Sequence, residues 1–146
     1  MIKIWFDGVC EPTNPNGYGA YGLYIIKEGK EILKESIFVG KGEGISNNVA
    51  EYSGFLRALE FLKDKNWQKE KIIIKGDSKL VIEQMFGSWK MKQGLYLNFA
   101  YKAKNLLNQF SNISGQWIPR EKNEICDKLA KDVLRNMKIR FKLQPE

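Results

Sequence analysis

The sequence contains no histidine and only two cysteines among its 146 residues. Without histidine, the chain has no imidazole for acid–base catalysis, for a Ser-His triad or for a histidine-containing zinc site. Cys10 and Cys126 are too few for a structural zinc site or a disulfide framework, and we expect both to be reduced. Several large enzyme classes are therefore excluded before any motif is considered.

The sequence also lacks the roughly 20 consecutive apolar residues of a membrane span. Its opening segment, residues 1–7, does not show the order of charged, apolar and small residues that marks a signal peptide. We therefore expect a cytoplasmic protein with no membrane partner. Hydrophobic residues make up 43% of the chain and charged residues 28%, a composition typical of a globular domain.

Acidic residues are fewer than basic residues in this sequence. Lysine and arginine number 24 against 17 aspartates and glutamates, which gives a net charge of +7. Such an excess favours a polyanionic partner such as nucleic acid. A basic protein without a nucleic-acid ligand is the alternative that charge alone leaves open.

Apolar patterning predicts the secondary structure. Runs and alternations predict strands at residues 2–7, 18–27, 30–39, 71–75 and 115–119. Helical spacing predicts helices capped at Ser46 or Asn47 and running to residue 63, and over residues 78–86, 95–110 and 124–137. A hairpin meander followed by alternating strands and helices indicates an α/β fold, a mixed sheet with helices packed on it.

The length suits one domain, which we place at residues 1–137, followed by a basic tail at residues 138–146. Basic and apolar residues alternate in the tail. That alternation suits either contacts with phosphates or an extra strand.

Four acidic residues occupy positions where acids are unexpected. Asp7 and Asp77 come at the carboxyl ends of two predicted strands, the edge where open α/β sheets bind ligands. Glu51 and Asp127 fall in the predicted first turns of two helices, on the faces that carry the apolar residues. The alternative is complementation of helix dipoles together with solvated strand ends.

Four converging carboxylates repel one another unless a cation neutralises them. Oxygen-only ligands favour Mg²⁺ or Mn²⁺ over zinc. In a basic protein, such a site indicates metal-assisted phosphodiester chemistry.

Short motifs then follow in a fixed order: Asp7-Gly8, Asn14-Pro15, Gly17-Tyr18-Gly19-Ala20, Ser46 to Glu51, Asp77-Ser78 and Asn123 to Ala130. In order and spacing they resemble ribonuclease H of type 1 over residues 1–136. The resemblance implies a five-stranded mixed sheet, an antiparallel meander plus parallel strands, flanked by helices. It also implies cleavage of the RNA strand of RNA–DNA hybrids with two Mg²⁺ or Mn²⁺ ions, leaving 5′-phosphate and 3′-hydroxyl ends.

The family's four catalytic and metal-binding carboxylates correspond to Asp7, Glu51, Asp77 and Asp127. The resemblance implies that Asp7 bridges both ions. It implies that Asp127 helps to hold the ion that activates the attacking water, while Glu51 and Asp77 hold the ion beside the leaving oxygen.

The resemblance also implies substrate-binding residues. Asn14, Asn47 and Asn48 match positions that contact the backbone and the ribose 2′-hydroxyls in the minor groove. Helix capping is the alternative for Asn47 and Asn48. Ser46 matches a position that holds a phosphate of the DNA strand, and capping is equally compatible with it.

Two departures from the family pattern are visible. Lys79 stands where many relatives have a glutamine that reads the minor groove. Many relatives carry a histidine in the loop before the last aspartate, and the corresponding residues 119–124 contain none. Arg120 or Glu124 is a candidate for its role, and a solvated loop is the alternative.

Two competing functions remain open at the level of sequence. One is a non-catalytic nucleic-acid-binding domain of the same fold, against which the retention of four carboxylates argues. The other is a DNA-directed nuclease, against which the ribose-reading asparagines argue. We expect a monomer, and double-stranded RNA remains open as a second substrate.

Overall fold

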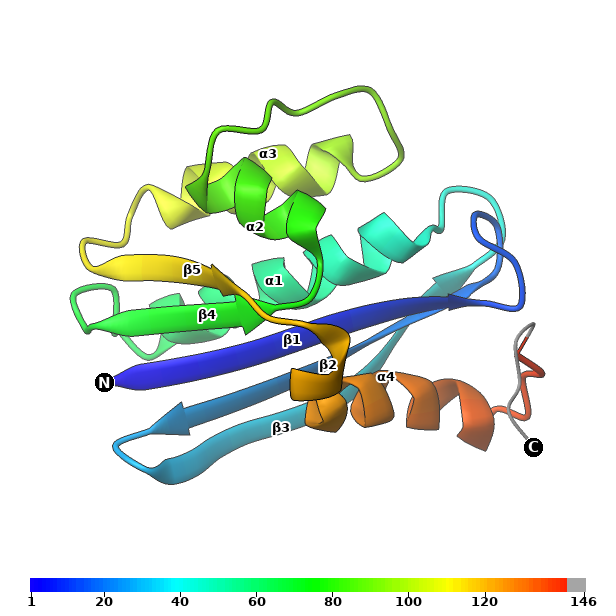
Figure 1. Cartoon of the computed structure of the whole chain (residues 1–146), viewed down its shortest axis with the longest axis horizontal. Helices are drawn as coiled ribbons and strands as arrows, with labels where there is room; N and C mark the ends of the chain where they lie inside the picture. Colours follow the sequence, from blue (N-terminus) through cyan, green and yellow to red (C-terminus); the bar gives the residue numbers. More distant parts are fainter. Residues whose placement is uncertain (142–146) are drawn as a thin grey trace.

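A computed structural model describes residues 1–141 (Figure 1). The elements in chain order are β1 (Ile2–Glu11), β2 (Tyr18–Lys27), β3 (Lys30–Lys41), α1 (Asn47–Asp64), β4 (Ile72–Gly76), α2 (Lys79–Phe86), α3 (Leu97–Leu107), β5 (Ile113–Trp117), the 3-10 helix η1 (Arg120–Lys122) and α4 (Glu124–Asn136). None of these helices is long and apolar enough to cross a membrane.

The five strands form one sheet in the order β3-β2-β1-β4-β5. β1 pairs with β2 antiparallel along its whole length, and β2 pairs with β3 antiparallel. β4 lies parallel to β1 on one side and to β5 on the other. The predicted five-stranded mixed sheet, a meander plus parallel strands, is confirmed.

The helices cover the two faces unequally. α1, α2 and α3 form a layer on one face, whereas α4 lies on the other (Figure 1). The larger core lies between the sheet and the α1–α3 layer and is built from buried strand residues such as Ile4 and Phe6 against Phe55 and Leu59 of α1. This arrangement leaves α4 to cover its face of the sheet with a much smaller apolar cluster.

The first strand is longer than the sequence predicts, since it continues through Glu11 instead of ending at Asp7. Turn-forming residues follow Glu11, but Gly8, Val9 and Cys10 remain paired with β2 and buried. The pairing of β1 with β4, however, stops at Phe6 opposite Gly76. Asp7 therefore stands where β1 loses its parallel neighbour, within a strand and not at its end.

Other boundaries shift by a few residues. The helix predicted over residues 95–110 is shorter, Leu97–Leu107, and β5 starts at Ile113, two residues earlier than expected. Residues 138–141 of the basic tail form no strand, so the extra-strand alternative is wrong for them. Instead Phe141 is buried in the apolar cluster beneath α4. The rest of the tail, residues 142–146, lies outside the described residues, and the domain division at residue 137 stays a prediction.

Candidate active site

Two glycines allow the helices to approach the sheet beside Asp7. A Cβ on Gly8 would lie 2.4 Å from the backbone nitrogen of Glu51, so the absence of a side chain lets α1 sit directly on β1. On the opposite face, a Cβ on Gly22 would lie 2.4 Å from the carbonyl oxygen of Cys126 in α4. Gly22 is the antiparallel partner of Asp7. Both helices therefore carry their acidic residues to the same point of β1.

The cleft that the four predicted carboxylates line lies at the carboxyl end of β4. Asp77 follows directly after Gly76, the last residue of β4. Ser78 then caps α2, since its Oγ accepts a hydrogen bond from the backbone nitrogen of Val81. With no strand beyond Gly76 to separate the two faces, the Asp77 side chain can meet groups from both layers.

The structure brings Asp7, Glu51 and Asp77 into a tight cluster. One carboxylate oxygen from each lies within 4.8 Å of the others. Asp7 is only 5% exposed and Glu51 only 3%, while Asp77 is partly buried. The prediction that Glu51 faces inward is confirmed. Its predicted place in the first helical turn is wrong, because it is the fifth residue of α1, so the helix dipole does not account for a buried acid there.

Burial and mutual repulsion make these acids hard to ionise. Burial, with the charge of Asp77, raises the pKa of Asp7 from 3.8 to about 8. Burial, followed by the charges of Asp7 and Asp77, raises the pKa of Glu51 well above its usual range. Burial also raises the pKa of Asp77, with the Arg120 charge acting in the opposite direction. The ionised form of the cluster is therefore electrostatically unfavourable without a cation.

The donor set fits a hard divalent cation. Oε2 of Glu51 and Oδ2 of Asp77 are buried and have no hydrogen-bond partner among the described residues. Buried oxygens without partners are costly, and a bound cation would satisfy them. Carboxylate oxygens are the ligands that Mg²⁺ and Mn²⁺ prefer, so these residues fit such an ion.

Asp127 reaches the same cleft but not the tight cluster. It lies in the first turn of α4, as predicted, and borders a cleft of about 450 Å³ together with the other three acids. One of its oxygens, Oδ2, lies 3.0 Å from Nζ of Lys131. All four predicted carboxylates therefore converge on one cleft, and the ammonium group of Lys131 compensates the charge of Asp127.

The predicted substrate-binding residues divide into two groups. Asn14, Asn47 and Arg120 line the cleft, and the backbone nitrogen of Asn47 donates to Oδ1 of Asn14 at 2.9 Å. Ser46 caps α1, since its Oγ accepts from the backbone nitrogen of Val49 at 3.1 Å. Capping is thus confirmed for Ser46, and the capping alternative is wrong for Asn47.

The structure does not place the remaining predicted contacts in the cleft lining. Asn48 is half-buried in the first turn of α1 and does not cap that helix. Lys79 is exposed, with its Nζ 5.5 Å from the centre of the Trp117 ring. Both stay predictions as substrate contacts, as does the phosphate contact of Ser46.

Sequence reasoning missed Asn123 as a positioning residue. Its side-chain nitrogen donates to the carbonyl oxygen of Phe6 at 2.8 Å, and the residue is only 1% exposed. This bond ties the start of α4, and with it Asp127, to the strand that carries Asp7. An asparagine directly before a predicted helix is a signal for a helix cap, but the Asn123 side chain makes no cap bond, so the sequence carries no signal for its bond to Phe6.

Three other lining residues come from α4 and the segment after it: Lys131, Arg135 and Phe141. Lys131 and Arg135 thus bring two basic side chains to the cleft that holds the four predicted carboxyl groups. Cys10 also lines the cleft, and both cysteines are buried and unpaired, as expected.

Comparison with known proteins agrees with this geometry. Residues 6–133 match the protein family described as Reverse transcriptase-like. The chain belongs to the Reverse transcriptase-like family. The expected resemblance of the chain to ribonuclease H of type 1 is confirmed by its similarity to the ribonuclease HI of Halobacterium salinarum in sequence and in structure.

The bifunctional protein Rv2228c of Mycobacterium tuberculosis is 33% identical over 120 residues, covering 82% of this chain and 31% of the relative. Ribonuclease HI of Halobacterium salinarum is 31% identical over 134 residues, covering 91% of this chain and 64% of the relative. The chain thus spans about a third of the length of Rv2228c and under two thirds of the length of the Halobacterium ribonuclease HI.

Solved structures are similar over nearly the whole chain. LC11-RNase H1, isolated from compost by a metagenomic approach, gives a TM-score of 0.81 at 29% identity, covering 93% of this chain and 96% of that one. RNase H1 from Halobacterium salinarum gives a TM-score of 0.78 at 29% identity, covering 92% of this chain and 98% of that one. The chain therefore shares the fold of these two RNase H1 structures over nearly the whole of each solved chain.

Proposed function

We propose that this protein is a metal-dependent endoribonuclease that hydrolyses the RNA strand of RNA–DNA hybrids, leaving 5′-phosphate and 3′-hydroxyl ends. The observation that carries the proposal is the cluster of Asp7, Glu51 and Asp77 at a cleft, with two buried oxygens that have no partner among the described residues. LC11-RNase H1, which was also solved in complex with an RNA/DNA hybrid, supports the substrate class by its similar fold, with a TM-score of 0.76 for that complex.

Asp7, Glu51, Asp77 and Asp127 would hold the metal, and we propose Mg²⁺ or Mn²⁺, with two ions once substrate is bound. Bound there, divalent ions supply activation of water and stabilisation of the charge that develops on the scissile phosphate. The chain's own contribution is a rigid set of oxygens. Gly8 seats α1 on β1, and Asn123 fixes α4 to the same strand.

Positive charge at the cleft would attract the phosphate backbone. Arg120 lies close enough to Asp77 to act against the rise in its pKa. Arg120, Lys131 and Arg135 all border the cleft. Arg120 is therefore our candidate for a phosphate contact in the loop that lacks the family's histidine.

The asparagines would read the RNA strand. Asn14 uses Oδ1 to hold the start of α1 through Asn47, so its amide nitrogen is the donor that it can offer to a 2′-hydroxyl. The 2′-hydroxyl distinguishes RNA from DNA at a site. We propose Asn14, Asn47 and Asn48 as ribose contacts, Ser46 as a contact to a DNA phosphate and Lys79 as a further backbone contact.

One chain supplies all four carboxylates, and we therefore propose that a monomer is active. We also propose that it acts in the cytoplasm. Double-stranded RNA is a candidate second substrate, and a direct comparison of substrates decides it.

The test compares a labelled RNA–DNA hybrid, double-stranded RNA and double-stranded DNA, each with Mg²⁺, Mn²⁺ or a chelator. We expect cleavage of the hybrid with either ion and none with the chelator. Asp7→Asn should lower the cleavage rate at least about a thousandfold, which corresponds to about 4 kcal/mol of activation free energy. The reason is that Asp7, the proposed metal ligand at the centre of the cluster, loses its negative charge. Asp64→Asn is the control, since Asp64 is exposed at the end of α1 and does not line the cleft.

Activity of Asp7→Asn within tenfold of wild type would refute the proposed site. Binding of the hybrid without cleavage under any metal would support the non-catalytic alternative. Cleavage of double-stranded DNA in preference to the hybrid would support the DNA-directed alternative.

A further inference from the structure

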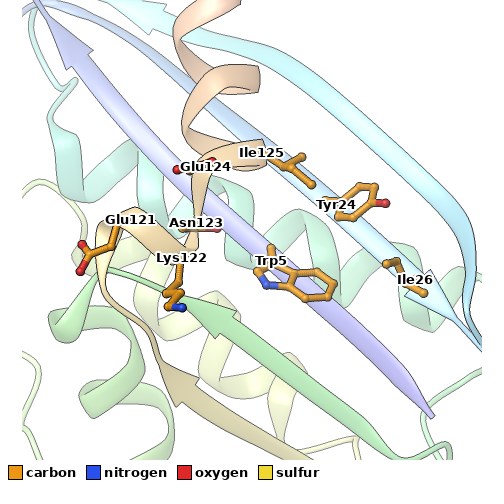
Figure 2. Close-up of a pocket in the computed structure, with 8 residues that line it drawn as sticks. All are labelled: Trp5, Tyr24, Ile26, Glu121, Lys122, Asn123, Glu124 and Ile125. Carbon is orange, nitrogen blue, oxygen red and sulfur yellow. The ribbon is translucent and has the colours of Figure 1, made fainter.

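A second hollow lies on the face of the sheet that carries α4, outside the carboxylate cleft. Trp5 of β1 and Tyr24 and Ile26 of β2 line it, together with Ile125 from the first turn of α4 (Figure 2). Its volume is about 490 Å³. The ring centres of Trp5 and Tyr24 are 5.7 Å apart, with their planes tilted by 42°. We call these four residues the aromatic face.

Lysines accompany the rings of the aromatic face. Nζ of Lys75 lies 5.2 Å from the centre of the Trp5 ring, and Nζ of Lys34 lies 5.9 Å from the centre of the Tyr24 ring. Lys122 lines the same hollow. An exposed cation–π contact of this kind is weak, so a phosphate can draw the ammonium away and leave the ring open.

Acidic residues also border the hollow, namely Glu121 and Glu124. Figure 2 shows the Glu121 carboxylate turned away from Trp5, towards the opposite side of η1. The ring faces of Trp5 and Tyr24 carry the ammonium groups of Lys75 and Lys34, whereas the carboxylate of Glu31 lies beside the Tyr24 hydroxyl at the edge of that ring.

We propose that the aromatic face binds single-stranded nucleic acid, with bases stacked on Trp5 and Tyr24 and phosphates held by Lys34 and Lys75. Unpaired bases have free π-faces, and aromatic side chains beside basic groups are the usual platform for them. In a duplex the bases stack on one another, so the rings would gain little from it. An apolar protein partner would bury the rings but leave the ammonium groups without an opposite charge, which favours a polyanion.

The surface continues from the aromatic face towards the carboxylate cleft. Trp5 and Lys122 also line a neighbouring hollow of about 420 Å³, which extends to Trp117. Trp117 is 45% exposed, and its indole nitrogen donates to the carbonyl oxygen of Asp77 at 3.2 Å. Trp5 itself precedes Asp7 on β1 by about 7 Å of strand. A single strand leaving the cleft beside Asp77 can therefore run over Trp117 and Trp5 to Tyr24.

Binding at the aromatic face needs neither the metal nor cleavage, so it can be measured separately from the proposed activity. The probes are fluorescein-labelled oligothymidylate and oligouridylate of about 12 nucleotides, within the usual site size for such platforms. Their anisotropy is titrated with the full chain in a chelator at about 50 mM salt.

The first variant combines Trp5→Leu with Tyr24→Leu, and we expect its affinity for the oligonucleotides to fall at least about tenfold. The second combines Lys34→Glu with Lys75→Glu, which keeps both rings in place. We expect it to bind more weakly and to show a salt slope shallower by about 1.4, the value for two lost contacts to a single strand. The matched control combines Tyr101→Leu with Lys102→Glu on α3, in the opposite layer, where Tyr101 is 54% exposed. It should bind as wild type does.

Failure of wild type to bind either oligonucleotide would overturn the proposal. The proposal would also be overturned if the leucine variant and the glutamate variant both bound the oligonucleotides with an affinity within twofold of wild type. Circular dichroism and thermal melting establish that each variant is folded, and if the leucine variant unfolds, the glutamate variant decides. None of these outcomes depends on whether the hybrid is cleaved.

Discussion

Asp7→Asn should change the pH dependence of stability as well as activity. The fold raises the pKa of this carboxyl to about 8, against 3.8 for an unburied aspartate. Between these two values the folded protein keeps a proton that the unfolded chain has released. The stability that this proton contributes is fully present below the pKa of the unfolded chain, 3.8, and is lost as the pH rises through the pKa of the folded protein, about 8. The free energy of unfolding should therefore fall by up to about 1.4 kcal/mol per pH unit.

Urea unfolding followed by circular dichroism measures this dependence. Between about pH 5 and about pH 7, with a chelator present, wild type should lose about 3 kcal/mol more than Asp7→Asn, because asparagine does not titrate. Asp64→Asn, at the exposed end of α1, should follow the wild-type curve. Added Mg²⁺ should raise the stability of wild type most at the higher pH, since a ligand bound to the folded state stabilises it.

Parallel curves for wild type and Asp7→Asn would refute the conclusion that burial and repulsion strain this carboxylate. A wild-type protein that gained stability relative to Asp7→Asn as pH rose would reverse the sign of the argument. Either result would mean that Asp7 is ionised at little cost in the folded protein.

Three further substitutions test how the site is positioned. Gly8→Ala should destabilise the fold by about 1–3 kcal/mol and slow cleavage, because the new Cβ would lie 2.4 Å from the backbone nitrogen of Glu51; an unchanged melting temperature would contradict this. Asn123→Ala should cost about 1–3 kcal/mol in urea unfolding through the lost bond to the Phe6 carbonyl, and a cost below about 0.5 kcal/mol would show that the bond is dispensable. Ser46→Ala should cost about 1 kcal/mol by removing the cap of α1, whereas Ser46→Asp should retain most of that stability; equal losses in both would argue against capping.

Periodicity predicts much of the site. Glu51 shares a helical face with Phe55, Ala58 and Leu62, and all four are buried. Asp127 shares a face with the buried Ala130 in the same way. Inward acids on two helices are visible in the sequence because helical spacing fixes a residue's face regardless of the helix's partner.

The local setting of Asp7 was not predictable in the same way. Gly8 is a turn-forming residue type, yet here it serves a close approach by α1. Whether a strand continues depends on its neighbours, and β1 keeps pairing with β2 after β4 has ended. The bond from Asn123 likewise depends on where α4 lands on the sheet, which no local pattern encodes.

The bond between Asn123 and Phe6 joins residues 117 positions apart, and this separation has a consequence for the order of assembly during synthesis. A growing chain acquires Asp7, Glu51 and Asp77 well before α4. At roughly 5–20 residues per second, a ribosome needs several more seconds to add the stretch that carries Asn123 and Asp127. The fourth carboxylate and the bond that positions it are therefore synthesised together, and a nascent chain cannot complete the cleft until α4 has docked on β1.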